Sequence, residues 1–312
     1  MKTVMVTGAS GLIGSELSEA LLNKGFKVIG VDNTPSACVG NPNFVFVQAA
    51  IEDKDAVTRA MSEHRIDALV HTACSVDNDL PNIITSAHDK QSAAVDKYLY
   101  KNAVTAGASD IILLSTHQVY ASPKTREPIR ESADEKPSSD YAKMKFDSEK
   151  ALAKVIKGSG SCKGVIARVC PIYTKTYVPN LHAKIYDPKD NCSFIYGYGD
   201  YGFTFCCLYN FIDFVLGILT VSGGINYQGV YNVCDSKPIL AKEIVEFERT
   251  HHKLGAVVQR NYSVVKSIGF GNKDAKIDYR YNDLSIVCSN ISYDNTKAQR
   301  ISTFRWKLSN TK

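Results

Sequence analysis

The chain has 312 residues, 44% of them hydrophobic, which is enough to bury one large core or one core with a smaller lobe. Its formal net charge of +5 is mild, and basic residues are interspersed with acidic ones, which disfavours nucleic-acid or membrane binding. The longest apolar stretch, residues 205–221, is interrupted by Asn210 and Asp213 and is too short for a membrane-spanning helix. A strand-like run begins at residue 3 and leaves no room for a signal peptide, so we expect a cytoplasmic protein.

The cysteines do not form the pattern of a disulfide framework or of a zinc site. There are nine, which is an odd number, no CxxC pair occurs, and several lie within apolar runs. We therefore expect buried or incidental thiols in a reducing compartment, and no bound metal.

Short apolar and β-branched runs alternate with helical segments through the first half of the chain. The predicted strands are residues 3–7, 26–31, 43–48, 68–71 and 111–114, with a return strand at 229–233. A helix at 15–23 has Leu17, Leu21 and Leu22 on one face and ends before Gly25. This alternation predicts an α/β fold with a doubly wound parallel sheet.

The regular alternation fades after about Tyr173, where Gly, Tyr and Asn become frequent. We therefore predict a sheet domain at 1–173, with its return strand at about 228–235. A smaller C-terminal lobe is predicted at 174–227 and 236–312, and we expect it to bind the substrate.

Three glycines lie between the first strand and the first helix, in TGASGLIG at 7–14. Gly8 permits a tight turn, Gly11 lets backbone N–H groups approach a pyrophosphate, and Gly14 lets the helix pack close to the strand. Asp32 ends the second strand 18 residues beyond Gly14, where a carboxylate can accept hydrogen bonds from both hydroxyls of a ribose. A carboxylate repels a 2′-phosphate and no Arg occurs at 33–40, so NAD is predicted rather than NADP.

Further motifs extend this pattern along the chain. They are VHTAC at 70–74, STHQVY at 115–120, Pro137 with Tyr141, Lys145 and Glu149, YNVCD at 231–235 and DNTKAQR at 294–300. Together with the glycine motif they resemble the extended short-chain dehydrogenases/reductases, which include nucleotide-sugar epimerases, dehydratases and reductases. The resemblance implies a Rossmann fold and an NAD site formed by Gly8, Ser10, Gly11, Leu12, Ile13, Gly14, Asp32, Asn33, Ile51, Thr72, Ala73, Tyr141, Lys145 and Pro171.

A Tyr followed four residues later by a Lys occurs at 120/124, 141/145, 262/266 and 293/297. Pro123 disfavours a helix in the first pair, and the last two pairs fall in the smaller lobe. Tyr141 and Lys145 open a predicted helix and share one face of it, which brings the ammonium near the phenol. This ammonium and an oxidised nicotinamide both favour the phenolate, so we expect the pKa of Tyr141 to be lowered.

The resemblance assigns catalytic roles to three of these residues. Tyr141 exchanges a proton with a substrate hydroxyl, Thr116 donates a hydrogen bond to the same oxygen, and Lys145 also holds the nicotinamide ribose. The candidate substrate contacts are Cys74, His117, Gln118 and Tyr173.

The substrate half departs from the family pattern. His117 and Gln118 stand where the family's dehydratases carry Asp and Glu, which disfavours dehydration. Pro171 replaces an Asn, Ala50 replaces an Asp near the adenine, and Phe203 replaces a phosphate-binding Arg. The loss of an Arg removes charge-assisted phosphate contacts.

Two functions therefore remain open. The first is an NAD-dependent oxidoreductase or epimerase that acts on a hydroxyl or ketone of a sugar or nucleotide sugar by hydride transfer. The alternative is a catalytically weak or inactive NAD(H)-binding sensor or assembly protein, which the altered substrate motifs favour. The resemblance also implies a homodimer formed through the helix at 141–156 and the segment at 87–106.

Overall fold

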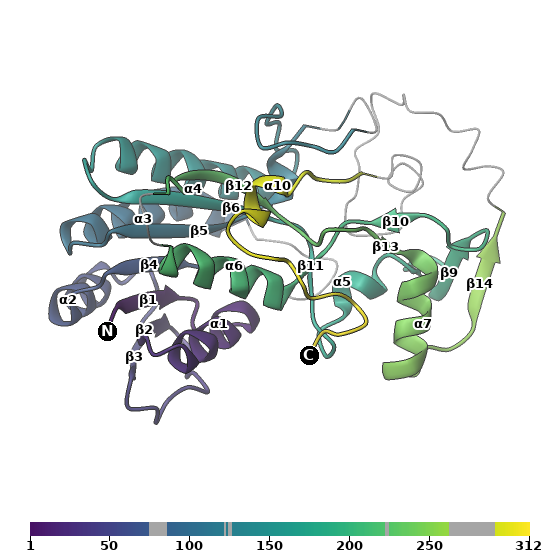
Figure 1. Cartoon of the computed structure of the whole chain (residues 1–312), viewed down its shortest axis with the longest axis horizontal. Helices are drawn as coiled ribbons and strands as arrows, with labels where there is room; N and C mark the ends of the chain where they lie inside the picture. Colours follow the sequence, from purple (N-terminus) through teal and green to yellow (C-terminus); the bar gives the residue numbers. More distant parts are fainter. Residues whose placement is uncertain (75–85, 122, 124–126, 222–224, 262–290) are drawn as a thin grey trace. The chain divides into compact units, whose positions relative to one another are not determined.

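The computed structural model describes residues 1–74, 86–121, 123, 127–221, 225–261 and 291–312 (Figure 1). The chain divides into two compact units. Unit 1 contains Met1–Thr116, Ser139–Arg168 and Ile212–Tyr231. Unit 2 contains His117–Ser138, Val169–Phe211 and Asn232–Lys312. The domain boundaries given above stay a prediction.

A parallel seven-stranded sheet, in the order β12-β6-β5-β4-β1-β2-β3, forms the centre of unit 1 (Figure 1). Its strands are β1 (Thr3–Thr7), β2 (Lys27–Asp32), β3 (Phe44–Gln48), β4 (Ala68–His71), β5 (Asp110–Thr116), β6 (Lys163–Val169) and β12 (Gly229–Val233). The strand order runs outward from β1 and β4 in opposite directions. The carboxyl ends of these two strands therefore form the reversal point at which doubly wound sheets bind their ligands. The predicted α/β fold is confirmed.

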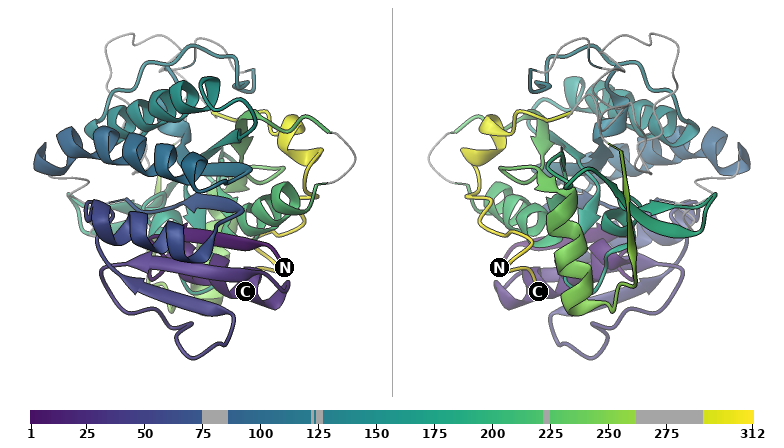
Figure 2. Two further views of the ribbon diagram at one scale, coloured as in Figure 1. Left: turned by 90° about the vertical axis from the view of Figure 1, so that its left-hand side faces the viewer. Right: turned by 90° about the vertical axis from the view of Figure 1, so that its right-hand side faces the viewer.

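Helices cover both faces of this sheet. They are α1 (Leu12–Asn23), α2 (Lys54–His64), α3 (Ser86–Thr105), α4 (Asp140–Lys157) and the later part of α6 (Leu208–Thr220). Side chains of α2, α3 and α4 share one hydrophobic cluster with the sheet, whereas α1 lies on the opposite face (Figure 1). Figure 2 shows α3 and α4 running side by side. The homodimer expected through these two helices stays a prediction.

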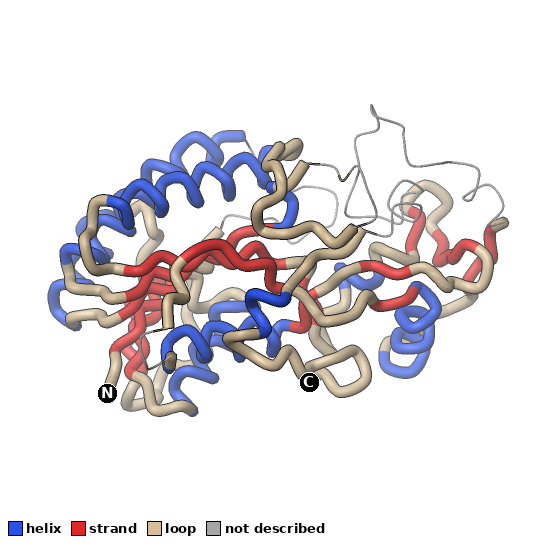
Figure 3. The backbone as a smooth tube through the Cα atoms, turned by 45° about the horizontal axis from the view of Figure 1, so that its top comes forward, coloured by secondary structure: helices blue, strands red, loops and turns tan. Residues whose placement is uncertain are grey.

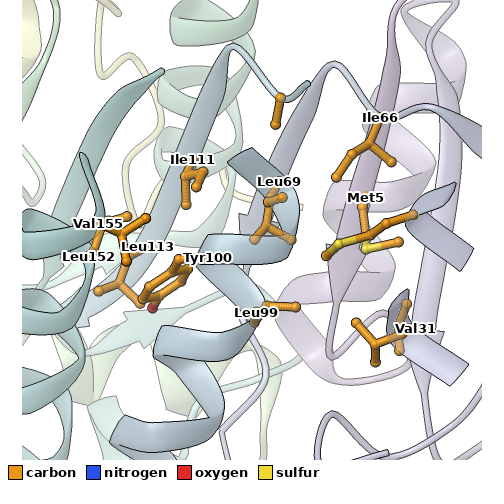
Figure 4. Packing of buried hydrophobic residues seen from close by; sticks show 14 of the residues in the cluster. Met5, Val31, Ile66, Leu69, Leu99, Tyr100, Ile111, Leu113, Leu152 and Val155 are labelled. Carbon is orange, nitrogen blue, oxygen red and sulfur yellow. The ribbon is translucent and has the colours of Figure 1, made fainter. Parts of the chain in front are cut away.

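The packing of this cluster follows from the alternation of side chains along each strand. Met5, Leu69 and Ile111 point to the same face, where Leu99 and Tyr100 of α3 cover them (Figure 4). All five side chains are at most 1% exposed. Truncation of a leucine in such a site to alanine costs about 2–5 kcal/mol of stability.

Unit 2 is built from short elements around an aromatic cluster. Figure 3 shows its strands as small separate pieces, and five of the seven that the structure describes have only two residues. They are β7 (Ile172–Tyr173), β8 (Tyr186–Asp187), β9 (Cys192–Tyr196), β10 (Gly202–Phe203), β11 (Cys206–Cys207), β13 (Ile239–Leu240) and β14 (Val257–Arg260). The helical segments are η1 (His117–Val119), α5 (Pro179–His182), α7 (Ala241–His251), α10 (Thr296–Gln299) and the first turn of α6.

The core of unit 2 contains Tyr173, Tyr201, Phe203, Phe205 and Phe247, packed with aliphatic side chains of α5 and α7. Cys170 and Cys206 are buried thiols, and burial raises the pKa of both. Over the part of the chain that the structure describes, no helix combines the length and the apolar character of a membrane span.

Candidate active site

Two of the three glycines between β1 and α1 have no room for a side chain. Gly8 has a φ of +73°, and a Cβ there would lie 2.8 Å from the backbone N and Cα of Ala73. A Cβ on Gly14 would lie 2.0 Å from the carbonyl oxygen of Gly8. Gly11, the N-cap of α1, would bring a Cβ to 3.5 Å from that oxygen, which is an ordinary contact. The turn therefore has the close backbone packing and the helix N-terminus that a pyrophosphate site requires.

Asp32, the last residue of β2, connects this turn to the next strand. Its Oδ2 accepts a hydrogen bond from the backbone N–H of Ser10 at 3.0 Å. Its Oδ1 accepts from both the N–H and the hydroxyl of Thr34, each at 3.0 Å. A carboxylate offers about four acceptor positions, so Oδ2 has capacity for one ribose hydroxyl in this arrangement. A second ribose hydroxyl would have to replace one of the Thr34 contacts.

The other predicted cofactor residues lie at several strand ends. Thr72 follows β4 and donates from its N–H and its hydroxyl to the Thr7 carbonyl, at 3.2 and 2.7 Å. Ala73 packs against Gly8, and Ile51 is half-buried beyond β3. Leu12 and Ile13 begin α1, Asn33 is exposed after β2, and Pro171 belongs to unit 2.

Helix α4 carries the predicted Tyr–Lys pair. It begins after Ser139, whose hydroxyl accepts the N–H of Ala142 at 3.1 Å. Lys145 is 3% exposed, and its Nζ donates to the carbonyl of Leu114 on β5 at 3.0 Å. The hydroxyl of half-buried Tyr141 forms a hydrogen bond with Thr116, the last residue of β5. Unit 1 therefore brings together all three residues that the sequence predicts to be catalytic.

Cys74 joins the same group of side chains and forms a hydrogen bond with Lys145. The sequence suggested Cys74 as a substrate contact. In the structure it follows β4 and contacts the predicted catalytic lysine.

The pKa of Tyr141 moves in the direction opposite to the one expected from Lys145 alone. Burial raises it, the Lys145 ammonium lowers it, Cys74 adds to the rise, and the Thr116 hydrogen bond lowers it. The desolvation of the phenolate thus outweighs the attraction of the ammonium. Burial lowers the pKa of Lys145, but its electrostatic interactions with Cys74, Tyr141 and Asp96 and its hydrogen bond with Cys74 outweigh burial and raise the pKa overall. Lys145 is therefore held as an ammonium.

Two other buried polar residues of unit 1 had no role in the sequence prediction. His71 ends β4 and Asp96 lies on α3; they are 1% and 5% exposed, with His71 Nε2 at 3.1 Å from Asp96 Oδ1. The sequence does contain a signal for them. A histidine ends an otherwise apolar strand, and an aspartate stands between buried Val95 and Leu99 on a helix.

His117 and Gln118 lie in η1 of unit 2. His117 is 5% exposed, its Nδ1 lies 3.2 Å from the carbonyl oxygen of Val169, and its ring makes an edge contact with Tyr293. Burial lowers the pKa of His117 to about 4. His117 is therefore neutral at physiological pH, and Gln118 is half-buried beside it.

Tyr173 and Phe203, the other residues of interest on the substrate side, are both buried in unit 2. Tyr173 is fully buried and donates its hydroxyl to Asp235 at 2.7 Å, which does not favour a substrate contact. Phe203 is 4% exposed and packs against Tyr201 and Phe205. The position at which the family pattern has an Arg is thus part of an aromatic core.

Comparison with known proteins assigns the family. The model of the "NAD dependent epimerase/dehydratase family" matches residues 4–234, which is most of the chain. The chain belongs to this family. Membership confirms the resemblance to extended short-chain dehydrogenases/reductases, and it confirms NAD as the cofactor predicted from the sequence.

Individual members of the family are more distant. A UDP-glucose 4-epimerase of Azospirillum brasilense is 30% identical over 153 residues, which cover 48% of this chain and 43% of that protein. A 3-beta-hydroxysteroid dehydrogenase of Mycolicibacterium neoaurum is 33% identical over 104 residues, which cover 33% of this chain and 28% of that protein. The chain thus spans less than half the length of these curated relatives.

Solved structures of the family share the fold over nearly the whole chain. The UDP-glucuronic acid 4-epimerase of Bacillus cereus, in complex with UDP-glucuronic acid and NAD, has a TM-score of 0.70 and 21% identity, covering 98% of this chain and 95% of that one. The Bordetella bronchiseptica enzyme WbmH, in complex with NAD+, has a TM-score of 0.71 and 20% identity, covering 100% and 95%. In the described residues of the present chain, no three His, Cys, Asp or Glu side chains are grouped to hold a metal.

Proposed function

We propose that the protein is an NAD-dependent epimerase that inverts a hydroxyl-bearing carbon of a nucleotide sugar, with UDP-hexoses as the first candidates. The supporting observation is the group formed by Tyr141, Thr116 and Lys145 in unit 1, with Lys145 held on the Leu114 carbonyl. Membership of the epimerase/dehydratase family and the UDP-sugar epimerases among the relatives support the same substrate class.

The cofactor is assigned to the turn after β1 and to the ends of the neighbouring strands. Gly8, Gly11 and the start of α1 would hold its pyrophosphate, because a Cβ on Gly8 or Gly14 would close this turn. Asp32 accepts an adenosine ribose hydroxyl, and Lys145 donates to the nicotinamide ribose. Bound NAD supplies reversible hydride transfer.

Tyr141 acts as the acid and base. Its phenolate takes the proton of the sugar hydroxyl as that carbon is oxidised, and it returns the proton when the carbon is reduced from the opposite face. Thr116 donates a hydrogen bond to the same oxygen, and the Lys145 ammonium stabilises the phenolate against the cost of burial.

The test uses the purified full chain with NAD and, separately, UDP-glucose, UDP-glucuronic acid and their 4-epimers. Product formation is followed by ¹H NMR of the anomeric protons. We expect epimerisation of at least one of these sugars, with kcat lowered about 10²–10⁴-fold in Tyr141→Phe and NAD affinity retained. Tyr98→Phe, a matched loss of a hydroxyl on α3 that bonds Thr58, should keep full activity.

Phe203 favours a second candidate, an NAD-binding protein with little turnover. In this candidate the core position of Phe203 leaves the substrate diphosphate without a charged partner there. NAD binding by the wild type, without product from any sugar in the panel and without a difference between Tyr141→Phe and wild type, would select this candidate.

A further inference from the structure

The contacts that hold Asp32 fill most of the positions at which its carboxylate accepts hydrogen bonds. The N–H and the hydroxyl of Thr34 both donate to Oδ1, and the N–H of Ser10 donates to Oδ2, each at 3.0 Å. No other residue that the structure describes bonds to this carboxylate. A carboxylate has about four acceptor positions, shared equally between its two oxygens. Thr34 therefore fills Oδ1 by itself, and Oδ2 has one position left.

The main chain at Thr34 is held independently of its hydroxyl. Ser10 Oγ donates to the Thr34 carbonyl at 2.6 Å, and the Thr34 N–H donates to Asp32. Pro35 follows and restricts the backbone of Thr34 further. Thr34 is exposed, so its hydroxyl can rotate into water, whereas its N–H cannot leave Asp32 unless the chain moves. The hydroxyl is therefore the contact that another donor can replace.

A ribose presents two neighbouring hydroxyl groups to such a carboxylate. One of them can donate to the open position on Asp32 Oδ2. The other needs a position on Oδ1 and competes there with the Thr34 hydroxyl. Hydrogen bonds to charged groups are stronger than those between neutral groups, so the bond that Thr34 gives up reduces the net gain from the ribose.

We propose that Thr34 lowers the affinity of the protein for NAD: its hydroxyl occupies the position on Asp32 Oδ1 that the second hydroxyl of the adenosine ribose requires. This inference rests on the proposed function, in which Asp32 accepts from the adenosine ribose. Thr34 is not among the residues predicted from the sequence to hold NAD, and it acts on the strength of binding through Asp32.

The opposite role for Thr34 makes the opposite prediction. If the hydroxyl served to orient Asp32 for the ribose, or accepted a hydrogen bond from it, its removal would weaken NAD binding. The geometry favours competition, because the N–H groups of Thr34 and Ser10 hold one carboxylate oxygen each without the hydroxyl. The carboxylate of Asp32 thus keeps its orientation when the hydroxyl leaves.

The first readout is the affinity for NAD, measured by isothermal calorimetry on the full chain. Thr34→Val removes the hydroxyl and keeps the shape of the side chain, Thr34→Ala is a second variant without the hydroxyl, and Thr34→Ser is the matched control that retains it. We expect NAD to bind about three- to tenfold more tightly to Thr34→Val and Thr34→Ala than to wild type, and to Thr34→Ser within about twofold of wild type.

A gain in affinity cannot come from a damaged fold, which makes the direction of the change decisive. Thermal unfolding of each variant checks that the chain is folded before the titration. Equal or weaker NAD binding by the folded variants without the hydroxyl would overturn the inference, and weaker binding would assign Thr34 the opposite role.

The second readout identifies the ribose hydroxyl that competes. NAD analogues that lack either the 2′- or the 3′-hydroxyl of the adenosine ribose are titrated into wild type and Thr34→Val. The gain from the substitution should disappear with at least one of the two analogues, because the competing hydroxyl is then absent. A gain of the same size with both analogues would show that Thr34 does not act through the ribose, and would overturn the inference.

These titrations need no sugar substrate. Absence of sugar turnover would therefore contradict the proposed epimerase alone, and the binding data would decide the inference by themselves. If wild type binds both analogues as tightly as NAD, the ribose does not lie on Asp32, and the inference is overturned together with that assignment.

Discussion

Glu149 on α4 and Arg168 on β6 form a buried ion pair, with Arg168 Nη2 at 2.7 Å from Glu149 Oε2 and Nε at 3.1 and 3.2 Å from the two carboxylate oxygens. Their side chains are 4% and 2% exposed. Glu149 also accepts a hydrogen bond from the hydroxyl of Ser115 on β5. Glu149, one turn after Lys145 on α4, therefore bonds this helix to two strands of the central sheet, β5 and β6.

This pair gives a prediction about stability. Glu149→Ala should lower the free energy of unfolding by about 3–5 kcal/mol, because it leaves the Arg168 guanidinium buried without its carboxylate. Urea unfolding followed by circular dichroism measures the change. The double variant Glu149→Leu/Arg168→Met, which removes both charges, should recover most of the loss. A double variant as unstable as Glu149→Ala would show that the charge left behind is not the cause.

The glycine turn gives a prediction about cofactor binding. Gly14→Ala should lower NAD affinity about tenfold or more, because the new methyl group meets the Gly8 carbonyl oxygen at 2.0 Å and must displace the turn. Gly25→Ala is the control for a glycine outside the site, since its φ of +82° also costs stability but nothing lies within 4 Å of its Cβ position. Isothermal calorimetry with NAD compares the two. Equal affinities in both variants would argue against a cofactor over this turn.

Asp32 gives a prediction about coenzyme choice. Asp32→Ser should weaken the binding of NADH and reduce the protein's preference for NADH over NADPH. The substitution removes the carboxylate that accepts a hydrogen bond from the ribose and repels a 2′-phosphate. Fluorescence titration with each reduced coenzyme measures both constants. Asp53→Ser changes another carboxylate, the N-cap of α2, and should leave the preference as in wild type. An unchanged NADH/NADPH ratio in Asp32→Ser would place the ribose elsewhere.

Asp235 gives a prediction about the pH dependence of stability. It accepts hydrogen bonds from the Cys207 N–H, the Asn210 amide and the Tyr173 hydroxyl, at 2.9, 2.7 and 2.7 Å. Burial raises its pKa to about 6, and these hydrogen bonds only partly offset the rise. Between pH 4 and 6 the folded protein therefore binds the proton that the unfolded chain has already released. This group makes the protein less stable as the pH rises through that window, by about 2–3 kcal/mol in total.

Asp235→Asn removes this titration. The unfolding free energy of the wild type minus that of Asp235→Asn should decrease from pH 4 to about pH 6.5 and stay constant above it. Urea unfolding at a series of pH values measures it. A difference that is constant with pH would mean that Asp235 has an ordinary pKa in the folded protein.

The sequence predicted those parts of the fold that depend on neighbouring residues. Strands β1 and β4 occur as predicted, because each is a short run of apolar and β-branched residues. Strand β5 (Asp110–Thr116) contains the predicted apolar run 111–114 and ends at Thr116 as expected; it begins one residue earlier, at Asp110, which pairs with Ala68 of β4. The glycine turn and the Tyr141–Lys145 pair could also be located, because each is defined by residues that lie close together in the sequence.

Contacts between distant residues could not be predicted in this way. Asp96, Arg168 and Asp235 find their partners 25, 19 and 62 residues away, and each partner is identified only by the packing of separate elements. For a similar reason the sequence could not reveal that burial, in the protein without NAD, raises the pKa of Tyr141. Helical spacing gives the position of the ammonium, whereas the loss of water around the phenol depends on the whole tertiary structure.

The Nζ of Lys145 is anchored on the main-chain carbonyl of Leu114. Every amino acid carries this oxygen, so no single substitution at position 114 can delete the acceptor itself. Substitutions at position 114 change the side chain and keep the hydrogen bond from Lys145 Nζ to the main-chain carbonyl. The orientation of the Lys145 ammonium therefore does not depend on which side chain stands at position 114.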